Sequence, residues 1–383
     1  MMVAFDTDSK PGRSVEQRIR IIACCLKHYE MAVLLAGLAL VGAGCSVANQ
    51  PRPRMGSYAT STPGTNFIGL TDLGAHNYDG IIETNGIVYT CRGGHVDIAH
   101  LRIAADHVRY LYGQTYKSLM RNKRELSFKL NVDRSHFFAS FSYPSDWKTQ
   151  DKEQKDYIAR AAAFELAQYF SFVLINWHEV LTFYGYKTMG VLPEFPSAFS
   201  WEDTYSNTIG VHLGARAIHS DTPYDEAMTT LLREELEYLG IQSADVARGA
   251  AEQMRGQWYD GNLLVTMHVR NTDIGLHDGL VWPMLVPGVC QEAQPLPYPA
   301  PQLDVVEQYG IGVTLEVEPR EFERGRILRI VYPDGGENRI NIDESLPVIM
   351  AAIEAEIIEK HGAFFRDGRY FEAREAGAPD EGY

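Results

Sequence analysis

Residues 92–102 contain the densest group of side chains that could carry out chemistry. The segment reads Arg-Gly-Gly-His-Val-Asp-Ile-Ala-His-Leu-Arg. On a helix, Asp97 and His100 are three residues apart and share one face. A carboxylate beside an imidazole is a common half-set of ligands for zinc or iron. The alternative is an acid–imidazole pair near a helix start, where acidic residues are favoured without any ligand.

A second group lies at residues 176–182, Asn-Trp-His-Glu-Val-Leu-Thr. It begins like the His-Glu-x-x-His signature of zinc metalloproteases, but Thr182 stands where the second histidine is required, so that class is excluded. His178 and Glu179 remain candidates, because charged side chains inside an otherwise apolar helix need partners. Alternatively, they point to solvent or form purely structural pairs.

A third group lies at residues 197–207. Ser200 and Asp203 have the spacing of a helix-capping pair, which favours a structural role for Ser200. Glu202 and Asp203 add two carboxylates. Gly210 and Gly214 continue the face of Asp203 without side chains, which permits a second helix or a ligand to approach closely.

The three groups together predict one chemistry. Five side chains are candidate ligands of a divalent metal ion such as zinc: Asp97, His100, His178, Glu202 and Asp203. The candidate catalytic residues are Glu179 and Arg102. Such an ion would lower the pKa of its bound water, with a glutamate as base, in a metal-dependent hydrolase. The alternative is a non-catalytic protein whose polar residues tie helices together or bind a partner.

The elements that position these groups follow from hydrophobic periodicity, and most of them are helices. A strand is expected at residues 86–90 and a hairpin at 125–132 and 136–143. The expected helices span residues 96–122, 152–183, 201–218, 223–239 and 244–254.

The residue pattern changes from helical to strand-like after Gly261. Apolar residues alternate at 263–269 and 311–317, and residues 327–332 are rich in β-formers. A last helix is expected at residues 347–361. The predicted fold class is α+β, with a mainly helical part at residues 67–260 and a smaller β-rich part at 261–383 that ends in a helix. The two parts are either separate or one continuous domain.

Composition restricts the class of protein. The chain has 383 residues, of which 45% are hydrophobic and 22% charged, as in a folded globular protein. Its formal charge is −15, from 35 basic and 50 acidic residues. No cluster of Lys and Arg offers the basic surface that phosphate backbones require, so a general nucleic-acid binder is excluded.

The N-terminal region predicts export. Residues 31–43 are apolar or Gly, a run too short to span a bilayer but suited to a signal peptide. The following Gly44-Cys45 resembles the lipobox of bacterial lipoproteins, although Gly42 stands where Leu is usual. We expect residues 1–44 to be a signal peptide, with a true start that could lie further in. Cys45 is the expected lipidation site and membrane anchor, with ordinary cleavage after Ala48 as the alternative.

After removal of the signal peptide, the chain would begin with a tether and would keep three cysteines. Residues 45–66 are expected to form the lipidated cysteine and a flexible tether, because Pro, Gly, Ser and Thr dominate them. If Cys45 carries lipid, Cys91 and Cys290 are the remaining thiols. They could form one disulfide in an oxidising compartment, but sequence cannot place them within bridging distance.

The combination of these motifs resembles an uncharacterised bacterial family. It comprises residues 86–94, the Asp97-x-x-His100-x-Arg102 pattern, Trp177-His178-Glu179 and residues 197–207. The resembling proteins are exported and carry a domain of unknown function. The resemblance covers the chain roughly from Pro51 onward. It implies a Gram-negative cell-envelope protein facing the periplasm and lends no known activity.

Overall fold

The computed structural model describes residues 50–80, 82–188, 192–193, 195–262 and 265–372. All of them belong to one compact unit, residues 49–383. The predicted signal peptide at residues 1–44, the lipidation site Cys45 and the alternative cleavage site after Ala48 lie outside the described residues. The predictions about them therefore stay predictions.

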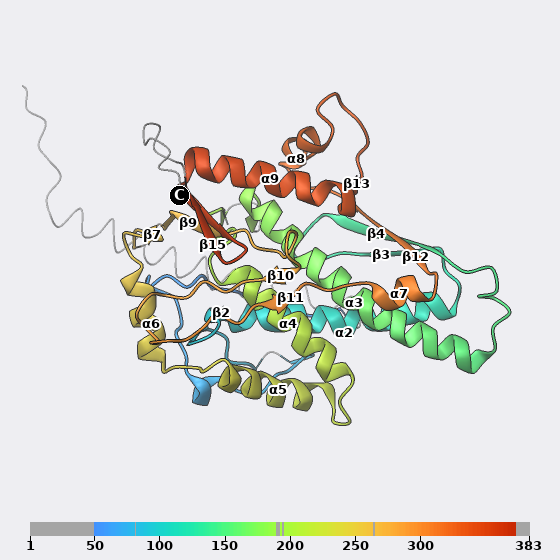
Figure 1. Cartoon of the computed structure of the whole chain (residues 1–383), viewed down its shortest axis with the longest axis horizontal. Helices are drawn as coiled ribbons and strands as arrows, with labels where there is room; N and C mark the ends of the chain where they lie inside the picture. The colour runs from blue at the N-terminus through green and yellow to red at the C-terminus, as the bar shows by residue number, and fades with distance from the viewer. Residues whose placement is uncertain (1–49, 81, 189–191, 194, 263–264, 373–383) are drawn as a thin grey trace, which may run out of the picture. The chain divides into compact units, whose positions relative to one another are not determined.

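Three helices form the centre of this unit: α2 (Ile98–Met120), α3 (Lys152–Phe183) and α4 (Asp203–Ile218). They pack side by side (Figure 1). Helix α3 begins where the Asp151 side chain accepts backbone N–H groups of the first turn, and it ends before Gly185, whose φ is +110°. It is long and apolar enough to cross a membrane, but 67% of its most apolar window is buried against other elements. Helix α3 is therefore a core helix of this unit.

Two glycines determine how α2 and α4 meet. A Cβ on Gly210 would lie 2.1 Å from the carbonyl oxygen of Leu101, and one on Gly214 would lie 2.6 Å from the Cα of Ala105. These glycines therefore admit a second helix, and not a ligand. Because Gly210 meets Leu101 and Gly214 meets Ala105, the two helices run in the same direction. Their N-termini therefore lie at the same end of the pair.

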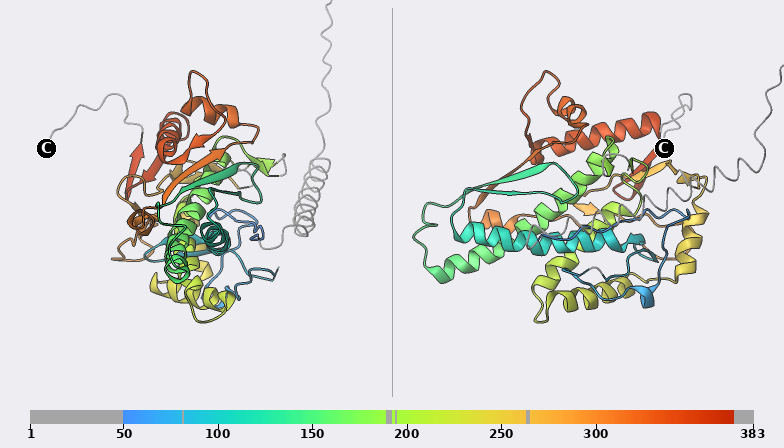
Figure 2. Two further views of the ribbon diagram at one scale, coloured as in Figure 1. Left: turned by 90° about the vertical axis from the view of Figure 1, so that its right-hand side faces the viewer. Right: turned by 180° about the vertical axis from the view of Figure 1, so that it is seen from behind.

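A four-stranded antiparallel sheet joins the two predicted parts of the chain. Its order is β13 (Ile340–Asn341), β12 (Gly312–Glu318), β4 (His136–Ser142) and β3 (Glu125–Phe128). Phe137 of this sheet packs edge-on against Trp177 of α3. Helix α9 (Ile342–Lys360) packs beside β12 and β13, and its first turn also meets α3, where the hydroxyl of Tyr169 donates to Asp343 (Figure 2). Since β12 pairs with β4 over seven residue pairs, residues 67–260 and 261–383 share one body.

The remaining elements lie around these three helices and the four-stranded sheet, and most of them are short. In chain order they are η2 (Leu70–Asp72), β1 (Ile87–Thr90), β2 (Gly94–Asp97), β5 (Lys187–Thr188), β6 (Leu192–Pro193), α5 (Tyr224–Tyr238), α6 (Ala244–Gln253), β7 (Tyr259–Asp260), β8 (Thr266–Met267), β9 (Val269–Asn271), β10 (Leu280–Val281), β11 (Tyr298–Pro299), α7 (Asp304–Gln308), α8 (Arg324–Val331), β14 (Ala363–Arg366) and β15 (Arg369–Glu372).

The α+β class is confirmed, and three local predictions need correction. Residues 327–332, expected to be β-rich, lie mostly in α8, where Ile327 is buried and the arginines face outward. The last helix begins at Ile342, a turn earlier than expected, and the β14–β15 hairpin follows it. Residues 50–66, expected to be part of a flexible tether, pack onto the body because Arg54 is buried in ion pairs with Glu83 and Asp106.

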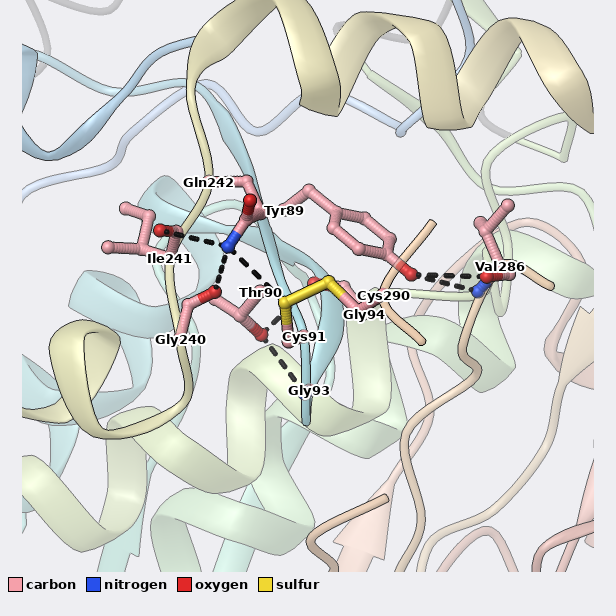
Figure 3. The surroundings of a disulfide bond; sticks show 10 residues. All are labelled: Tyr89, Thr90, Cys91, Gly93, Gly94, Gly240, Ile241, Gln242, Val286 and Cys290. Carbon is pink, nitrogen blue, oxygen red and sulfur yellow. Dashed lines mark hydrogen bonds between the residues drawn. A yellow bond between two sulfur atoms is a disulfide. The ribbon is translucent and has the colours of Figure 1, made fainter. Parts of the chain in front are cut away.

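A disulfide joins Cys91 to Cys290, which are 199 residues apart in sequence with their Cα atoms 5.4 Å apart (Figure 3). Cys91 directly follows β1 at the tip of the β1–β2 hairpin. Next to the disulfide, the side chain of Gln242 donates to the carbonyl of Gly240, with an N···O distance of 2.9 Å. The bond therefore ties the hairpin that leads into α2 to the loop around Cys290.

Candidate functional site

The N-termini of α2 and α4 bring four of the predicted residues together. Asp97 is the N-cap of α2, and its Oδ1 accepts the N–H of Ala99 at 2.7 Å. His100 lies in the first turn of the same helix. Glu202 is at the N-cap position of α4 and Asp203 is its first residue. Because the two helices run parallel and in contact, their starts converge, and each dipole favours negative charge at that end.

The imidazole of His100 lies between two buried carboxylates. Its Nδ1 is 3.0 Å from Oδ2 of Asp97 and 3.1 Å from Oδ1 of Asp203. Neither contact has the geometry of a hydrogen bond, so the two carboxylates act on the imidazole through their charge. Burial alone would lower the pKa of His100, but the charges of Asp97 and Asp203 outweigh it and place that pKa well above the ordinary value. The imidazole is therefore positively charged at neutral pH.

Both carboxylates are fixed by further hydrogen bonds. Oδ2 of Asp97 also accepts the backbone N–H of Ser57, at 2.8 Å. Oδ2 of Asp203 accepts the backbone N–H and the hydroxyl of Ser200, at 3.0 and 2.8 Å. Ser200 therefore has a structural role, but not the predicted one of capping the helix, since the N-cap position of α4 is Glu202. Its two bonds to Oδ2 leave Oδ1 of Asp203 near His100.

Glu179, near the end of α3, adds a carboxyl group whose charge interacts with this pair. Its Oε2 accepts the backbone N–H of Phe199 at 3.0 Å. Burial, reinforced by the negative charge of Asp203, raises the pKa of Glu179 to about 7. Phe199 has a φ of +52°, a strained conformation for a bulky residue, and such strain is concentrated at functional sites.

Glu202 is fully buried, and its Oε1 accepts the N–H of Ala59 at 2.7 Å and the hydroxyl of Ser200 at 2.9 Å. Burial, followed by the nearby charge of Asp203, raises the pKa of Glu202 well above the ordinary value. We call Asp97, His100, Glu179, Glu202 and Asp203 the His100 cluster.

Several buried polar atoms beside the His100 cluster have no hydrogen-bond partner among the described residues. They include Oε2 of Glu202 and both side-chain polar atoms of Asn207, one turn after Asp203 on α4. Buried polar atoms are nearly always paired in folded proteins, and exceptions gather where a ligand, water or substrate is bound. The cluster therefore differs from an ordinary structural network.

Arg270 of β9 belongs to the same region and was missed by the sequence analysis. It is 1% exposed, donates to the carbonyl of Ala198 and stacks on Phe195, with its guanidinium carbon 4.6 Å from the ring centroid. Burial lowers its pKa to about 10, against the opposing effect of Glu179 and Asp203. The one available signal was an arginine directly after the alternating apolar residues 263–269.

Two predicted residues lie elsewhere. The Nδ1 of His178 is 2.8 Å from Oδ1 of Asp133, in the loop between β3 and β4. Arg102 donates to the carbonyls of Thr84 and Leu73, at 2.7 and 2.9 Å, so its guanidinium fastens a loop and takes no part in the His100 cluster.

The five predicted metal ligands are therefore not assembled into one site. Among the described residues, no group of three or more His, Cys, Asp or Glu side chains is arranged to hold a metal ion. His100, Asp97 and Asp203 come closest to the predicted arrangement, because an imidazole nitrogen and two carboxylate oxygens converge there.

A second buried ionic group surrounds Asp106, which lies further along α2 than His100. We call it the Arg54 cluster, and its members are Arg54, His76, Glu83 and Asp106. Nη1 of Arg54 is 2.7 Å from Oδ2 of Asp106, and its Nε is 2.8 Å from Oε2 of Glu83. Nε2 of His76 is 2.9 Å from Oδ1 of Asp106. Each carboxylate here is matched by an arginine.

Comparison with known proteins gives one finding. Residues 65–268 match the model of a family described as a protein of unknown function, DUF4056. No curated protein matches the chain, and no solved structure does. The matched range contains the whole His100 cluster, whereas Arg54 and Arg270 lie outside it.

Proposed function

The chain belongs to the DUF4056 family, whose description names no activity, and from the geometry of the site we propose that it is a hydrolase whose acid–base centre is the His100 cluster. The observation that carries the proposal is the placement of Nδ1 of His100 between two buried carboxylates, 3.0 and 3.1 Å away. An imidazole whose positive charge is stabilised by two buried carboxylates is placed as a group that can give up and take back a proton.

Two groups of the cluster have complementary protonation states. His100 is protonated at neutral pH and is suited to donate a proton to a leaving group, and the pKa of Glu179, raised to about 7, suits a base that accepts a proton from water. Hydrolysis needs both transfers. The water oxygen forms the new bond to the substrate, its proton passes to Glu179, and the leaving group takes the proton of His100.

A divalent metal ion such as zinc remains the alternative basis for the same activity. Nδ1 of His100 would have to be deprotonated so that this nitrogen and the oxygens of Asp97 and Asp203 could face one ion. The charged state of His100 in this arrangement favours the acid–base form. Metal dependence is therefore an outcome of the test below.

We further propose that the protein is exported to the cell envelope of a Gram-negative bacterium and held there by lipid on Cys45. The apolar run at residues 31–43 and the following cysteine support this location. The Cys91–Cys290 disulfide adds support, because disulfides persist in oxidising compartments and are rare in the cytosol. A Cys45→Ala variant should lose labelled fatty acid and membrane fractionation. Unchanged membrane attachment would contradict the anchor.

The activity is tested on purified full-length protein with two probes, p-nitrophenyl acetate and isolated peptidoglycan sacculi. We expect His100→Gln and Glu179→Gln to abolish hydrolysis seen in the wild type. His268→Gln is the matched control, since it removes a histidine that pairs with Asp260 at the surface, 2.9 Å away.

The outcomes of this test separate the alternatives. Loss of wild-type activity on adding EDTA, with recovery on adding zinc, would support the metal-dependent form. Activity that persists in both site variants would overturn the proposal. No turnover by the wild type on either probe would leave the His100 cluster as a polar network of a non-catalytic envelope lipoprotein with a partner-binding role.

A further inference from the structure

Residues 51–61, which we call the strap, cross the His100 cluster and are fastened on both sides of it. At one end, the carbonyl of Pro51 accepts the side-chain N–H of Asn131 at 2.8 Å, and Arg54 is buried in the Arg54 cluster. At the other end, the N–H of Ser61 donates to the hydroxyl of Tyr259 at 3.1 Å. The strap is therefore held in place over the site and is not a loose linker.

Between these ends, the strap contacts the cluster through its backbone. The N–H of Ser57 donates to Oδ2 of Asp97, the same oxygen that faces His100, and the N–H of Ala59 donates to Oε1 of Glu202. Both acceptor groups are completely buried. These two bonds therefore fix the positions of two carboxyl groups of the cluster from outside helices α2 and α4.

Gly56 packs directly against the imidazole. A Cβ at this position would lie 2.8 Å from Cε1 and 2.9 Å from Nε2 of His100, and 3.1 Å from Oδ2 of Asp97. Real Cβ atoms almost never lie this close to another atom, so a side chain at residue 56 would force the strap or the imidazole to shift. The strap thus lies along the Cε1–Nε2 edge of the ring, while Nδ1 faces the two carboxylates. The side chain of His100 remains 21% exposed.

We propose that Gly56, Ser57 and Ala59 are positioning residues of the active site, and that Gly56 limits what reaches Nε2 of His100. The role in an active site rests on the proposed function, whereas the contact of the strap with His100 can be tested without turnover. The strap precedes residues 65–268, the range that matches the family model, so part of the site is supplied from outside that range.

The test compares the full chain with Gly56→Ala and with Gly249→Ala, a control in which the added Cβ on α6 meets no atom within 4 Å. The probe is diethyl pyrocarbonate, which acylates only the neutral imidazole, so the three proteins are compared at one alkaline pH at which part of His100 is neutral. Labelling of His100 is followed by peptide mass spectrometry. We expect Gly56→Ala to raise the labelling rate by about fivefold or more, because the new methyl group displaces the strap or the ring. Gly249→Ala should leave the labelling rate unchanged. Equal rates in all three proteins would overturn the proposal.

A second measurement serves if Gly56→Ala does not fold. Hydrogen exchange at the amide of Ala59 should be slow in the wild type and in Glu202→Gln, which keeps a side-chain oxygen as acceptor, and faster in Glu202→Ala. Exchange at Ala59 that is equally fast in all three proteins would contradict the contact.

The labelling and exchange results do not depend on a substrate. A protein that shows both effects but hydrolyses neither probe would contradict the proposed hydrolase and leave the strap contact intact. A hydrolase in which Gly56→Ala changes neither labelling nor activity would contradict only the role of the strap.

Discussion

The Arg54 cluster and the His100 cluster each include a residue of helix α2, Asp106 and His100, and they differ in how their carboxylates are compensated. In the Arg54 cluster, the guanidinium of Arg54 bonds to both Asp106 and Glu83. In the His100 cluster, one imidazole faces Asp97 and Asp203, and two further carboxyl groups with raised pKa values lie nearby. Each cluster has buried polar atoms without a hydrogen-bond partner, among them Nδ1 of His76 in the first and Oε2 of Glu202 in the second. The difference lies in the carboxyl groups: ion pairs outweigh burial and lower the pKa values of Glu83 and Asp106, whereas burial raises those of Glu179 and Glu202.

This difference indicates which cluster serves stability and which serves chemistry. Buried ion pairs with well-placed partners lock segments together, and breaking one is costly because it leaves a buried charge uncompensated. Carboxyl groups whose pKa values are raised by burial and by a neighbouring negative charge are typical of sites that transfer protons. We therefore expect substitutions in the two clusters to have opposite signatures, large on stability in one and large on activity in the other.

The largest expected effect on stability comes from the Arg54 cluster. Arg54→Met should lower the free energy of unfolding by about 3–5 kcal/mol, because Asp106 and Glu83 lose their buried partner. Urea unfolding of the full chain measures it. Arg324→Met on α8 is the control, because its guanidinium is exposed, and it should cost less than about 0.5 kcal/mol. Equal losses in both variants would show that the Arg54 cluster is not a structural lock.

The disulfide is expected to come next. A Cys91→Ser/Cys290→Ser double variant should lose about 2–4 kcal/mol of unfolding free energy, because the bond closes a long loop in the unfolded chain. Since the bond holds the hairpin that ends at Asp97, amide exchange should rise in β1 and β2 more than around Asp106. Uniform exchange changes along α2 would contradict that link.

The pH dependence of stability should report on the His100 cluster. The pKa of Glu179 is raised from an ordinary 4.5 to about 7, so between these values the folded state binds a proton that the unfolded state does not. The contribution of Glu179 to the unfolding free energy should therefore fall as the pH rises through this window, by up to about 3 kcal/mol. Above the window the raised pKa values of His100 and Glu202 continue the decline. Glu179→Gln should make the fall shallower between pH 5 and 7, while Glu202, whose pKa is also raised, keeps part of the slope. An unchanged slope would place Glu179 outside the titrating set.

The smallest effect is expected for the surface pair of Asp260 and His268. Both side chains are more than a third exposed, so His268→Gln should change the free energy of unfolding by less than about 0.5 kcal/mol. A loss comparable to that of Arg54→Met would show that burial does not separate the pairs in this protein.

The sequence predicted the helical framework well. Residues 152–183 were expected to form one helix and do so, because the run is long and apolar and is bounded by Asp151 and Gly185. The grouping of Asp97 with His100, and of Glu202 with Asp203, also followed from spacing, since these pairs lie at helix starts. The failure at α8 has a physical reason. Residues 327–331 are β-formers by type, but arginines at helical spacing keep one face of a helix in solvent.

The parts that sequence could not provide depend on contacts between distant segments. The strap reaches the cluster through backbone N–H groups of Ser57 and Ala59, which leave no trace in side-chain type. Arg270 reaches the His100 cluster from β9, a strand that is positioned by its parallel pairing with β14. His178 was grouped with His100 by residue type alone, and its neighbour Asp133 lies 45 residues earlier in the chain.

The central claim is that two carboxylates hold His100 as a charged proton-transfer group. Its most direct test is an NMR titration of the His100 imidazole in the full chain, with the resonance assigned by its loss in His100→Gln. We predict that His100 titrates well above the usual histidine range and that Asp203→Asn lowers its pKa. A His100 that titrates at the ordinary histidine value in both proteins would contradict the account.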